Sequence, residues 1–414
     1  MHILSGVNMM SQELVLVHAE EDKLARIAFT DIPGCPAASP QHSLIMPDER
    51  TVYVTTDAVP PYRASILALY LNDIDWDRGT IDASLLQVLP LDVSGAPTDM
   101  PTVEQVDTNQ PIMPWTRWRN TQTHAPTLLP RAPFLYAAHY TDDRLRAFKI
   151  NRDGTLESRI VYSDRPLTRQ THGISFNPNG SVGLGVGYDY DMSELRLLDV
   201  NQHTGAMEVT RTIPLGEPTE LGTEPTKYGA FVHRAVWLDN RYAYLGTMQV
   251  GPTSRTLPGD TLAGPSIWLI DTQRETAKLV IKPTDNVNGA GIVLPPSDVA
   301  VAKTKLYVAE EDSWTTNDDM GGYGETGYVS IWDIEDRAKP RFIKRLRPGR
   351  ELPDDFRNAH TATAMFDEDS VFVSSFVSNH LVRIDTTTDR VAHVFTAKDG
   401  LEMYHGEFAA GRMG

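Results

Sequence analysis

A short segment that begins with a histidine recurs along the chain, and this repeat constrains the fold more than any other feature. In each copy the histidine precedes an apolar run, a turn, and a second apolar run that ends in polar residues. Because the copies recur over the whole chain, we expect repeated supersecondary units rather than unrelated domains. The histidines are His42, His124, His172, His233, His360 and His405, and a seventh copy, PSDVAVAKTKLYVAEED, carries Asp298 at that position.

The apolar runs have the composition of β-strands. The second run of each copy, as in TVYVTTD and KLYVAEE, is short, rich in β-branched and aromatic residues, and bounded by turn residues. A third run usually follows, as in ELRLLDV and SIWLIDT, and helical periodicity is almost absent. Each interval between copies has room for four strands and a loop. Four antiparallel strands per unit, repeated radially, predict an all-β fold with a single seven-bladed β-propeller.

The two ends of the sequence indicate how such a propeller closes. The last copy starts at YHGEFAAG, close to the C-terminal end of the sequence. We expect ELVLVHAEEDKLARIAF, near the N-terminal end, to supply the second and third strands of that blade, which removes a free sheet edge. Residues 1–414 are then one domain, with long loops near 72–120, 214–230, 251–264 and 313–327 that rim one face.

Charge and cysteine content narrow the classes of partner and site. The formal net charge of -17 repels phosphate backbones and anionic lipid, so we expect a small-molecule substrate and neither nucleic acid nor membrane as a partner. A single cysteine, Cys35, allows neither an internal disulfide nor a cysteine zinc cage. The N-terminal residues lack the pattern of a signal peptide, and no stretch has the length and apolarity of a transmembrane helix. Both observations predict a cytoplasmic protein.

One segment carries a family resemblance. The run FLYAAHYTDDRLRAFKINRDGTL, followed by THGISFNPNG, resembles the seven-bladed propeller lactonases, a family that includes 6-phosphogluconolactonase-type proteins and fungal carboxymuconate cyclases. The close match covers two blades, at about residues 135–180. NPNG stands where the family has P-D-G, and His139 stands where it usually has Asn. The resemblance implies a propeller enzyme that opens a lactone or forms one.

The strand phase predicts where functional side chains gather. In a propeller the first strand of each blade lines the central channel, and its start lies at the same mouth as the end of the second strand. The seven repeat positions are therefore expected to form an inner ring, with His42 as the outlier because the insertion beside it is the longest. The acidic strand ends GYDYD (187–191) and EED (310–312) are interpreted as solvated turns. An outer set comprises His18, Asp57, His139, Tyr188, Met248, Glu310 and Phe376.

Three interpretations of the ring stay open. In the first, each side chain only hydrogen-bonds a neighbouring blade or turn. In the second, three or four imidazoles bind one zinc, copper, iron or manganese ion with an open position for substrate. In the third, the histidines act as general acids and bases without a metal, beside an arginine that holds a carboxylate. The predicted metal ligands are His124, His172, His233 and His360.

The function predicted from these patterns is an enzyme that acts on a small oxygenated metabolite at the channel mouth, with lactonase-like or cyclase-like chemistry as the resemblance implies. The alternatives are a histidine-coordinated, metal-dependent oxidase or lyase and a non-catalytic binding scaffold. The candidate catalytic residues are His124, His172, His233, His360 and His405. The candidate substrate-binding residues are Arg169, Arg357, His139, Tyr188, Trp115 and Glu310.

Overall fold

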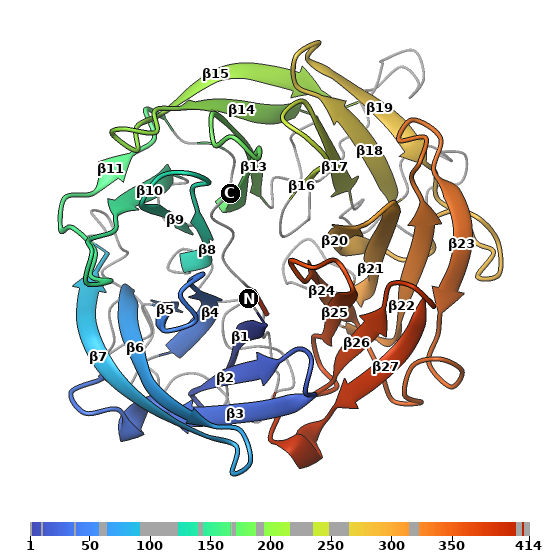
Figure 1. The fold of residues 1–414 in the computed structure, drawn as a ribbon. Helices are drawn as coiled ribbons and strands as arrows, with labels where there is room; N and C mark the ends of the chain where they lie inside the picture. Colours follow the sequence, from blue (N-terminus) through green and yellow to red (C-terminus); the bar gives the residue numbers. More distant parts are fainter. Residues whose placement is uncertain are drawn as a thin grey trace.

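The structure is a computed structural model, and it describes residues 2–9, 11–36, 39–57, 64–91, 123–139, 144–165, 167, 171–187, 194–215, 235–247, 265–313, 323–402 and 408–409. Within these ranges the regular structure consists of β-strands and two short 3-10 helices, Phe29–Asp31 and Ala397–Asp399. The expectation of an all-β fold is confirmed. The strands form antiparallel sheets that are arranged radially as the blades of a propeller (Figure 1).

The first three blades follow the chain in order, and in each the first strand lies nearest the axis. Blade one contains β4 (Ser39–Ile45), β5 (Thr51–Asp57), β6 (Ser65–Asp75) and β7 (Thr80–Pro90). Blade two contains β8 (Thr123–Leu128), β9 (Phe134–His139), β10 (Arg144–Lys149) and β11 (Val161–Tyr162). Blade three contains β12 (Thr171–Phe176), β13 (Val182–Gly187), β14 (Glu194–Val200) and β15 (Met207–Pro214).

The next three blades repeat this order. Blade four contains β16 (Val236–Trp237), β17 (Tyr242–Thr247), β18 (Ser266–Asp271) and β19 (Thr276–Ile281). Blade five contains β20 (Pro296–Ala302), β21 (Lys305–Ser313), β22 (Tyr323–Asp333) and β23 (Arg341–Leu346). Blade six contains β24 (Ala359–Ala364), β25 (Ser370–Ser375), β26 (Leu381–Asp385) and β27 (Arg390–Phe395).

Blade seven joins the two ends of the chain. It contains β1 (Ile3–Asn8), β2 (Glu13–His18) and β3 (Lys23–Ala28), and Ala409 pairs with Ser5 on the inner edge of β1. The predicted closure by both ends is confirmed, but the predicted strand positions were wrong. ELVLVHAEEDKLARIAF forms the third and fourth strands, because Ile3–Asn8 takes the second position. That strand, ILSGVN, contains serine, glycine and asparagine, so its composition concealed a fully buried strand.

The predicted loop near residues 72–120 begins later than expected. Residues 72–75 end β6 and residues 80–90 form β7, so the two strands make a long hairpin. The exposed residues that suggested a loop lie on the outer strand of a blade, where one side of the sheet faces solvent. A parallel pair between Arg26 of β3 and Thr80 of β7 joins blades seven and one at this outer edge.

The two ends of each blade differ in their connections. At one end, hairpins join the first strand to the second and the third to the fourth; we call this the far end. At the other, which we call the mouth end, the first strands begin and the second strands stop. The longer connections, among them residues 282–295 and 347–358, lie at the mouth end. Chemistry that needs several blades together is therefore expected at the mouth end.

A buried aromatic residue in the second strand fixes most of the boundaries between blades. Four tyrosines at the same strand position each donate a hydrogen bond to the hairpin between the third and fourth strands of the next blade. Burial raises the pKa of each of these hydroxyls above its ordinary range, so they stay protonated donors. The pairs are Tyr53 with the Gly154 carbonyl (2.9 Å), Tyr136 with Gly205 (3.0 Å), Tyr244 with Arg337 (2.7 Å), and Tyr307 with Asp389 Oδ1 (2.9 Å).

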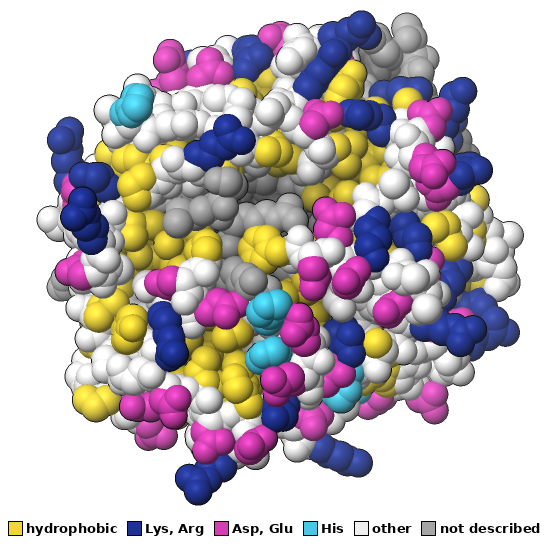
Figure 2. Space-filling view, in the orientation of Figure 1, with side chains coloured by type: hydrophobic (Ala, Val, Ile, Leu, Met, Phe, Trp, Pro, Cys, Tyr) yellow, Lys and Arg dark blue, Asp and Glu magenta, His cyan; other side chains and the backbone are white. Residues whose placement is uncertain are grey.

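Hydrophobic side chains surround the centre of the face shown in Figure 2, and acidic and basic side chains are mixed around its rim. The negative net charge is thus not gathered into a single acidic surface on this face. Among the described residues, no helix has the length and apolarity needed to cross a membrane.

Candidate functional site

The first strands share a local irregularity at the mouth end. A β-bulge, or an equivalent shift of register, falls between Pro40 and His42 in β4, between His124 and Thr127 in β8, and between Thr171 and Gly173 in β12. The same shift falls between Pro296 and Asp298 in β20 and between Ala359 and Ala362 in β24. Bulges reorient side chains and are enriched beside active sites. The repeat positions seen in the sequence therefore coincide with a repeated distortion around the channel.

The register shows which repeat positions are equivalent. In β8, Thr127 pairs with the buried Tyr136, and His124 stands three residues earlier. In β24, Thr363 pairs with the buried Phe372, and His360 stands three residues earlier. The predicted equal heights of these two histidines agree with the ladder.

In β20, Ala300 pairs with the buried Tyr307, and the residue three positions earlier is Ser297. Ser297 is therefore the equivalent of His124 and His360, and Asp298 lies one position farther along the strand. The buried carboxylate of Asp298 accepts hydrogen bonds from the Val299 N–H (2.9 Å) and from the Ala362 N–H of blade six (3.0 Å). This is the blade-to-blade contact that the structural interpretation described. In β4 the same count selects Gln41, so His42 lies one position farther along, as Asp298 does. That His42 is the outlier of a converging ring stays a prediction.

The best-defined polar cluster at the mouth end centres on His360. Its Nδ1 lies 2.7 Å from Glu311 Oε2, and the two side chains are only 3% and 2% exposed. Ser297 Oγ lies 3.2 Å from the same nitrogen, and the imidazole packs on Phe376 with ring centroids 4.5 Å apart. Three strands of two blades, β20, β21 and β24, thus hold one imidazole in place.

The positions of Glu311 and Ser297 around the His360 imidazole restrict the chemical roles that these residues can take. A buried carboxylate beside Nδ1 favours the tautomer that carries its proton on Nδ1, and proton exchange or metal ligation then falls to Nε2. Ser297 approaches the same nitrogen as Glu311, on the side opposite to Nε2. A serine nucleophile needs its hydroxyl on one imidazole nitrogen and the carboxylate on the other. Ser297 is therefore a positioning group for His360 and not a nucleophile.

Glu310, a predicted substrate-binding residue, forms a buried ion pair. Its Oε1 lies 3.2 Å from Nε of Arg345, and both side chains are almost fully buried. Its Oε2 accepts hydrogen bonds from the N–H groups of Val293 and Leu294. Arg345 donates in turn to the carbonyls of Val287 and Gly291. The pair fixes the connection 282–295 at the mouth, and a substrate role for Glu310 stays a prediction.

The interpretation of residues 310–312 as a solvated turn was wrong. Glu310, Glu311 and Asp312 are all buried, because β21 continues to Ser313 and carries them between blades. Glu311 is the principal residue that sequence reasoning missed. The available signal was a row of acids directly after an apolar strand, opposite a histidine of the neighbouring copy.

The other predicted residues are placed less completely. His124, His172 and His139 lie in β8, β12 and β9, and the structure describes their backbone positions only. The Arg357 side chain is exposed on the connection that enters β24, so its proposed contact with substrate stays a prediction. Five predicted residues lie outside the described ranges: His233, His405, Arg169, Tyr188 and Trp115.

The convergence of the ring therefore stays a prediction, and so does a metal site. Among the residues that the structure describes, no group of three or more His, Cys, Asp or Glu side chains has the arrangement of a metal site. Of the four predicted metal ligands, His360 is the one whose side chain is described.

Comparison with known proteins supports the fold. No protein-family model matches the sequence, and no curated protein matches it. Among solved structures, a protein from Bacteroides uniformis described as a "putative 6-phosphogluconolactonase" superimposes with a TM-score of 0.60 at 10% identity, over 99% of this chain and 100% of that one. A functionally unknown protein from Desulfotomaculum acetoxidans gives 0.58 at 13% identity, over 99% of both chains. The Cps50 (Swd1) β-propeller domain of Myceliophteria thermophila gives 0.50 at 9% identity, over 87% of each.

Proposed function

We propose that the protein is an enzyme that acts on a small oxygenated metabolite at the mouth of the propeller channel, with a lactone or similar cyclic ester as the substrate. The observation that carries the proposal is the contact of 2.7 Å between His360 Nδ1 and Glu311 Oε2. Structural likeness to a protein described as a lactonase supports the choice of substrate class, and the fold alone does not decide it.

In the proposed reaction His360 is the general base and then the general acid. Its Nε2 takes a proton from water, and the oxygen attacks the lactone carbonyl. The bond between the acyl carbon and the ring oxygen breaks, and the imidazolium returns the proton to the departing alkoxide. Glu311 stabilises the imidazolium and holds its tautomer, while Ser297 and Phe376 fix the ring orientation. Arg357 is the candidate cation for a substrate carboxylate.

A second candidate is a metal-dependent oxidase or lyase. The same Glu311–His360 contact favours it, because metal-ligating histidines almost always give their other nitrogen to a carboxylate, carbonyl or water. His124 occupies the equivalent strand position in blade two, so its imidazole is a candidate for the same ion. Ligands beyond His360 would come from His124, His172 and His233.

Metal content and lactone hydrolysis, measured on one tag-free preparation, separate the candidates. Hydrolysis in a lactone panel without stoichiometric metal, reduced at least 100-fold in His360→Gln, supports acid–base catalysis. Stoichiometric zinc, copper, iron or manganese that is lost in His360→Gln supports the second candidate. A protein with neither metal nor turnover contradicts both and leaves a binding scaffold. His203→Gln is the matched control, because His203 is exposed in the far-end hairpin before β15.

A further inference from the structure

A second polar relay lies at the mouth end of blade six, apart from the Glu311–His360 cluster. The turn after β25 runs from Ser375 to His380, and the connection into β24 passes beside it. Nδ1 of His380 lies 3.0 Å from Ser378 Oγ, and its Nε2 lies 3.4 Å from Asp355 Oδ1. Here the serine and the carboxylate contact opposite nitrogens of one imidazole. This is the arrangement that Ser297, Glu311 and His360 lack.

We propose that Ser378, His380 and Asp355 form a Ser–His–Asp relay that makes Ser378 a nucleophile toward small carboxylic esters and related acyl compounds. The order of contacts is the one that acyl transfer requires: the hydroxyl faces one nitrogen, and the carboxylate faces the N–H of the other. This activity is separate from the reaction proposed for His360, and it uses none of the same residues.

The surroundings of His380 favour its neutral imidazole, which is the form that can act as a base. The His380 side chain is 7% exposed and packs on the buried Phe356, with ring centroids 6.0 Å apart. Burial lowers the pKa of His380 below its ordinary value of 6.5, while the charge of Asp355 opposes that shift. The neutral form therefore prevails at neutral pH. The relay requires the tautomer with its hydrogen on Nε2, 3.4 Å from the exposed carboxylate of Asp355, and its lone pair on Nδ1, beside Ser378.

The turn presents the serine in a constrained conformation. Asn379 has a φ of 53°, in the left-handed region that asparagine tolerates better than most residues. Ser378 Oγ donates a hydrogen bond to Ser375 Oγ (2.8 Å) and accepts one from the Arg357 N–H. The relay therefore requires the Ser378 hydroxyl to rotate its hydrogen from Ser375 to Nδ1 of His380. Within the described part of the chain no hydrogen bond engages the N–H of Asn379. The N–H after a nucleophilic serine is a common oxyanion donor.

The proposed step balances without another reactant. Ser378 Oγ forms a bond to the acyl carbon, and its proton passes to Nδ1 of His380. The bond between the acyl carbon and the alcohol oxygen then breaks, and the proton moves from Nδ1 to the departing alkoxide. Water repeats the sequence on the acyl-enzyme, which releases the carboxylic acid and restores the serine. Asp355 stabilises the transient imidazolium throughout.

A fluorophosphonate tests the relay directly, because it reports a nucleophilic serine without knowledge of the natural substrate. With the full-length protein, we expect one covalent adduct per chain, mapped to Ser378, as the phosphorus–fluorine bond breaks and fluoride leaves. The labelling rate should rise with pH through a midpoint below 6.5. His380→Gln should slow labelling at least 100-fold and Asp355→Asn about 10-fold, whereas Ser181→Ala should have no effect.

Two outcomes overturn the proposal: no adduct on folded wild-type protein, or an adduct at Ser378 that forms equally fast in His380→Gln. Either result would mean that the three residues only brace the turn. Peptide mapping of the wild-type adduct identifies the labelled residue directly, so the test does not depend on whether a variant that lacks the Ser378 hydroxyl folds. Glu311→Gln should label like wild type, so failure of the His360 mechanism and failure of this relay are distinguishable.

Discussion

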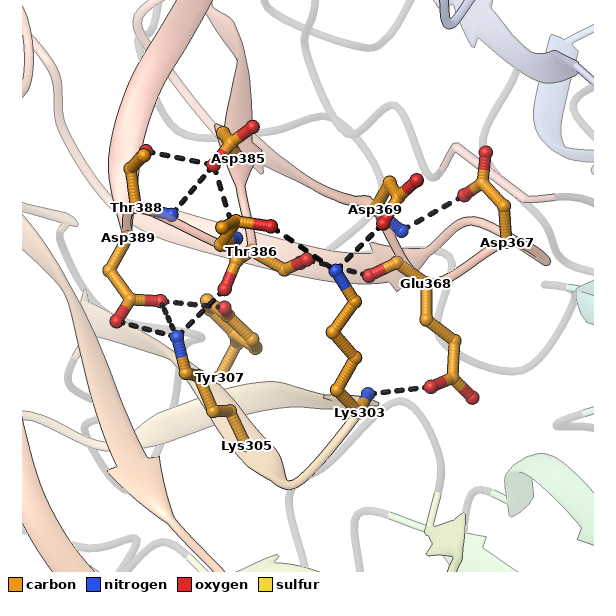
Figure 3. Close-up of polar contacts among 11 residues, drawn as sticks. Lys303, Lys305, Tyr307, Asp367, Glu368, Asp369, Asp385, Thr386, Thr388 and Asp389 are labelled. Carbon is orange, nitrogen blue, oxygen red and sulfur yellow. Dashed lines mark hydrogen bonds and ion pairs between the residues drawn. The ribbon is translucent and has the colours of Figure 1, made fainter.

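The boundary between blades five and six has two ends that are built in opposite ways, although strand β21 reaches both. At the mouth end β21 contributes Glu311, which faces His360 of β24. At the far end it contributes Lys305 and Tyr307, which both contact Asp389 of the hairpin before β27 (Figure 3). One end holds a carboxylate beside an imidazole. The other pairs a carboxylate with a lysine and a tyrosine.

In the far-end cluster, the Asp389 carboxylate is bound by both a lysine and a tyrosine. Lys305 Nζ lies 2.8 Å from both oxygens of Asp389 and 2.7 Å from the Thr386 carbonyl, and the Tyr307 hydroxyl donates to the same carboxylate. Lys303 adds a more exposed pair with Asp369 nearby (Figure 3). A buried charge with all its partners present favours stability, whereas an imidazole whose proton can move favours chemistry. We therefore expect the far end to stabilise the fold and, if the proposed function holds, the mouth end to carry the chemistry.

The largest expected effect is on turnover at the mouth end. His360→Gln should lower kcat for the substrate found in the lactone panel by about 10²- to 10⁴-fold, because it removes the proposed general acid–base group. Glutamine can still donate an amide hydrogen to Glu311, so the melting temperature should fall far less than turnover does. Steady-state kinetics and thermal unfolding of the same preparation check both. If the variant loses activity only because it is unfolded, His360 has a structural role, like the residues of the far-end cluster.

At the far end the expected effect is on stability alone. Asp389→Ala should lower the free energy of unfolding by about 3 kcal/mol, because it leaves the partly buried Lys305 without its partner. Urea unfolding measures this, and kcat should stay within about twofold of wild type. Asp369→Ala is the control, since its pair with Lys303 is exposed and should contribute little. A large loss of turnover in folded Asp389→Ala would break the division between the two ends.

The boundary between blades six and seven sharpens the comparison, because Phe372 replaces the tyrosine there. Arg383 Nε and Nη2 each lie 2.7 Å from an oxygen of Asp22, so a bidentate ion pair bridges this boundary where the other blades have the tyrosine contact. Asp22→Ala should lower the free energy of unfolding by about 2 kcal/mol, since it removes two charge-assisted hydrogen bonds. Chemical unfolding measures the loss. No loss would mean that the other contacts across this boundary, among them the hydrogen bond from Thr363 Oγ1 to the Phe408 carbonyl, are enough to close the ring.

The smallest effects are expected from single hydroxyls. Tyr53→Phe and Tyr136→Phe should each lower the free energy of unfolding by about 1 kcal/mol, because each leaves one carbonyl of the next blade without its donor. Tyr307→Phe should cost more than either, because its acceptor is a carboxylate. Equilibrium unfolding of the three variants gives the order. Equal losses would show that the charge of Asp389 is already satisfied by Lys305.

Most of the fold was predictable because it depends on short-range patterns. The strands around Tyr53, Tyr136, Tyr244 and Tyr307 are rich in β-branched and aromatic residues, and their recurrence implied radial repetition although the copies are unevenly spaced. The strand Ile3–Asn8 was missed because it contains serine, glycine and asparagine in place of some β-branched and aromatic residues. All six residues of this strand are nevertheless buried in the closing blade. Burial there follows from the neighbouring blades, which a single sequence does not display.

The strand positions of the candidate site residues were predictable from the sequence only to within one residue. The sequence placed His360 at the mouth end, and the structure agrees, but the bulges in the first strands shift the register by one position. That shift selects Ser297 in place of Asp298 as the equivalent of His360. A bulge inserts one residue without altering the hydrophobic pattern on either side, so periodicity does not reveal it.

The sequence by itself determined the repeat, the strand composition and the histidine or aspartate at the start of each unit, since these follow from local side-chain chemistry. The tertiary structure alone decided which side chains meet. Glu311 faces His360 across 49 positions, and His380 faces Asp355 of the connection before β24, because the blades and their connections bring separate segments to one mouth. Such meetings depend on register and packing between blades, and neither is encoded in any single segment.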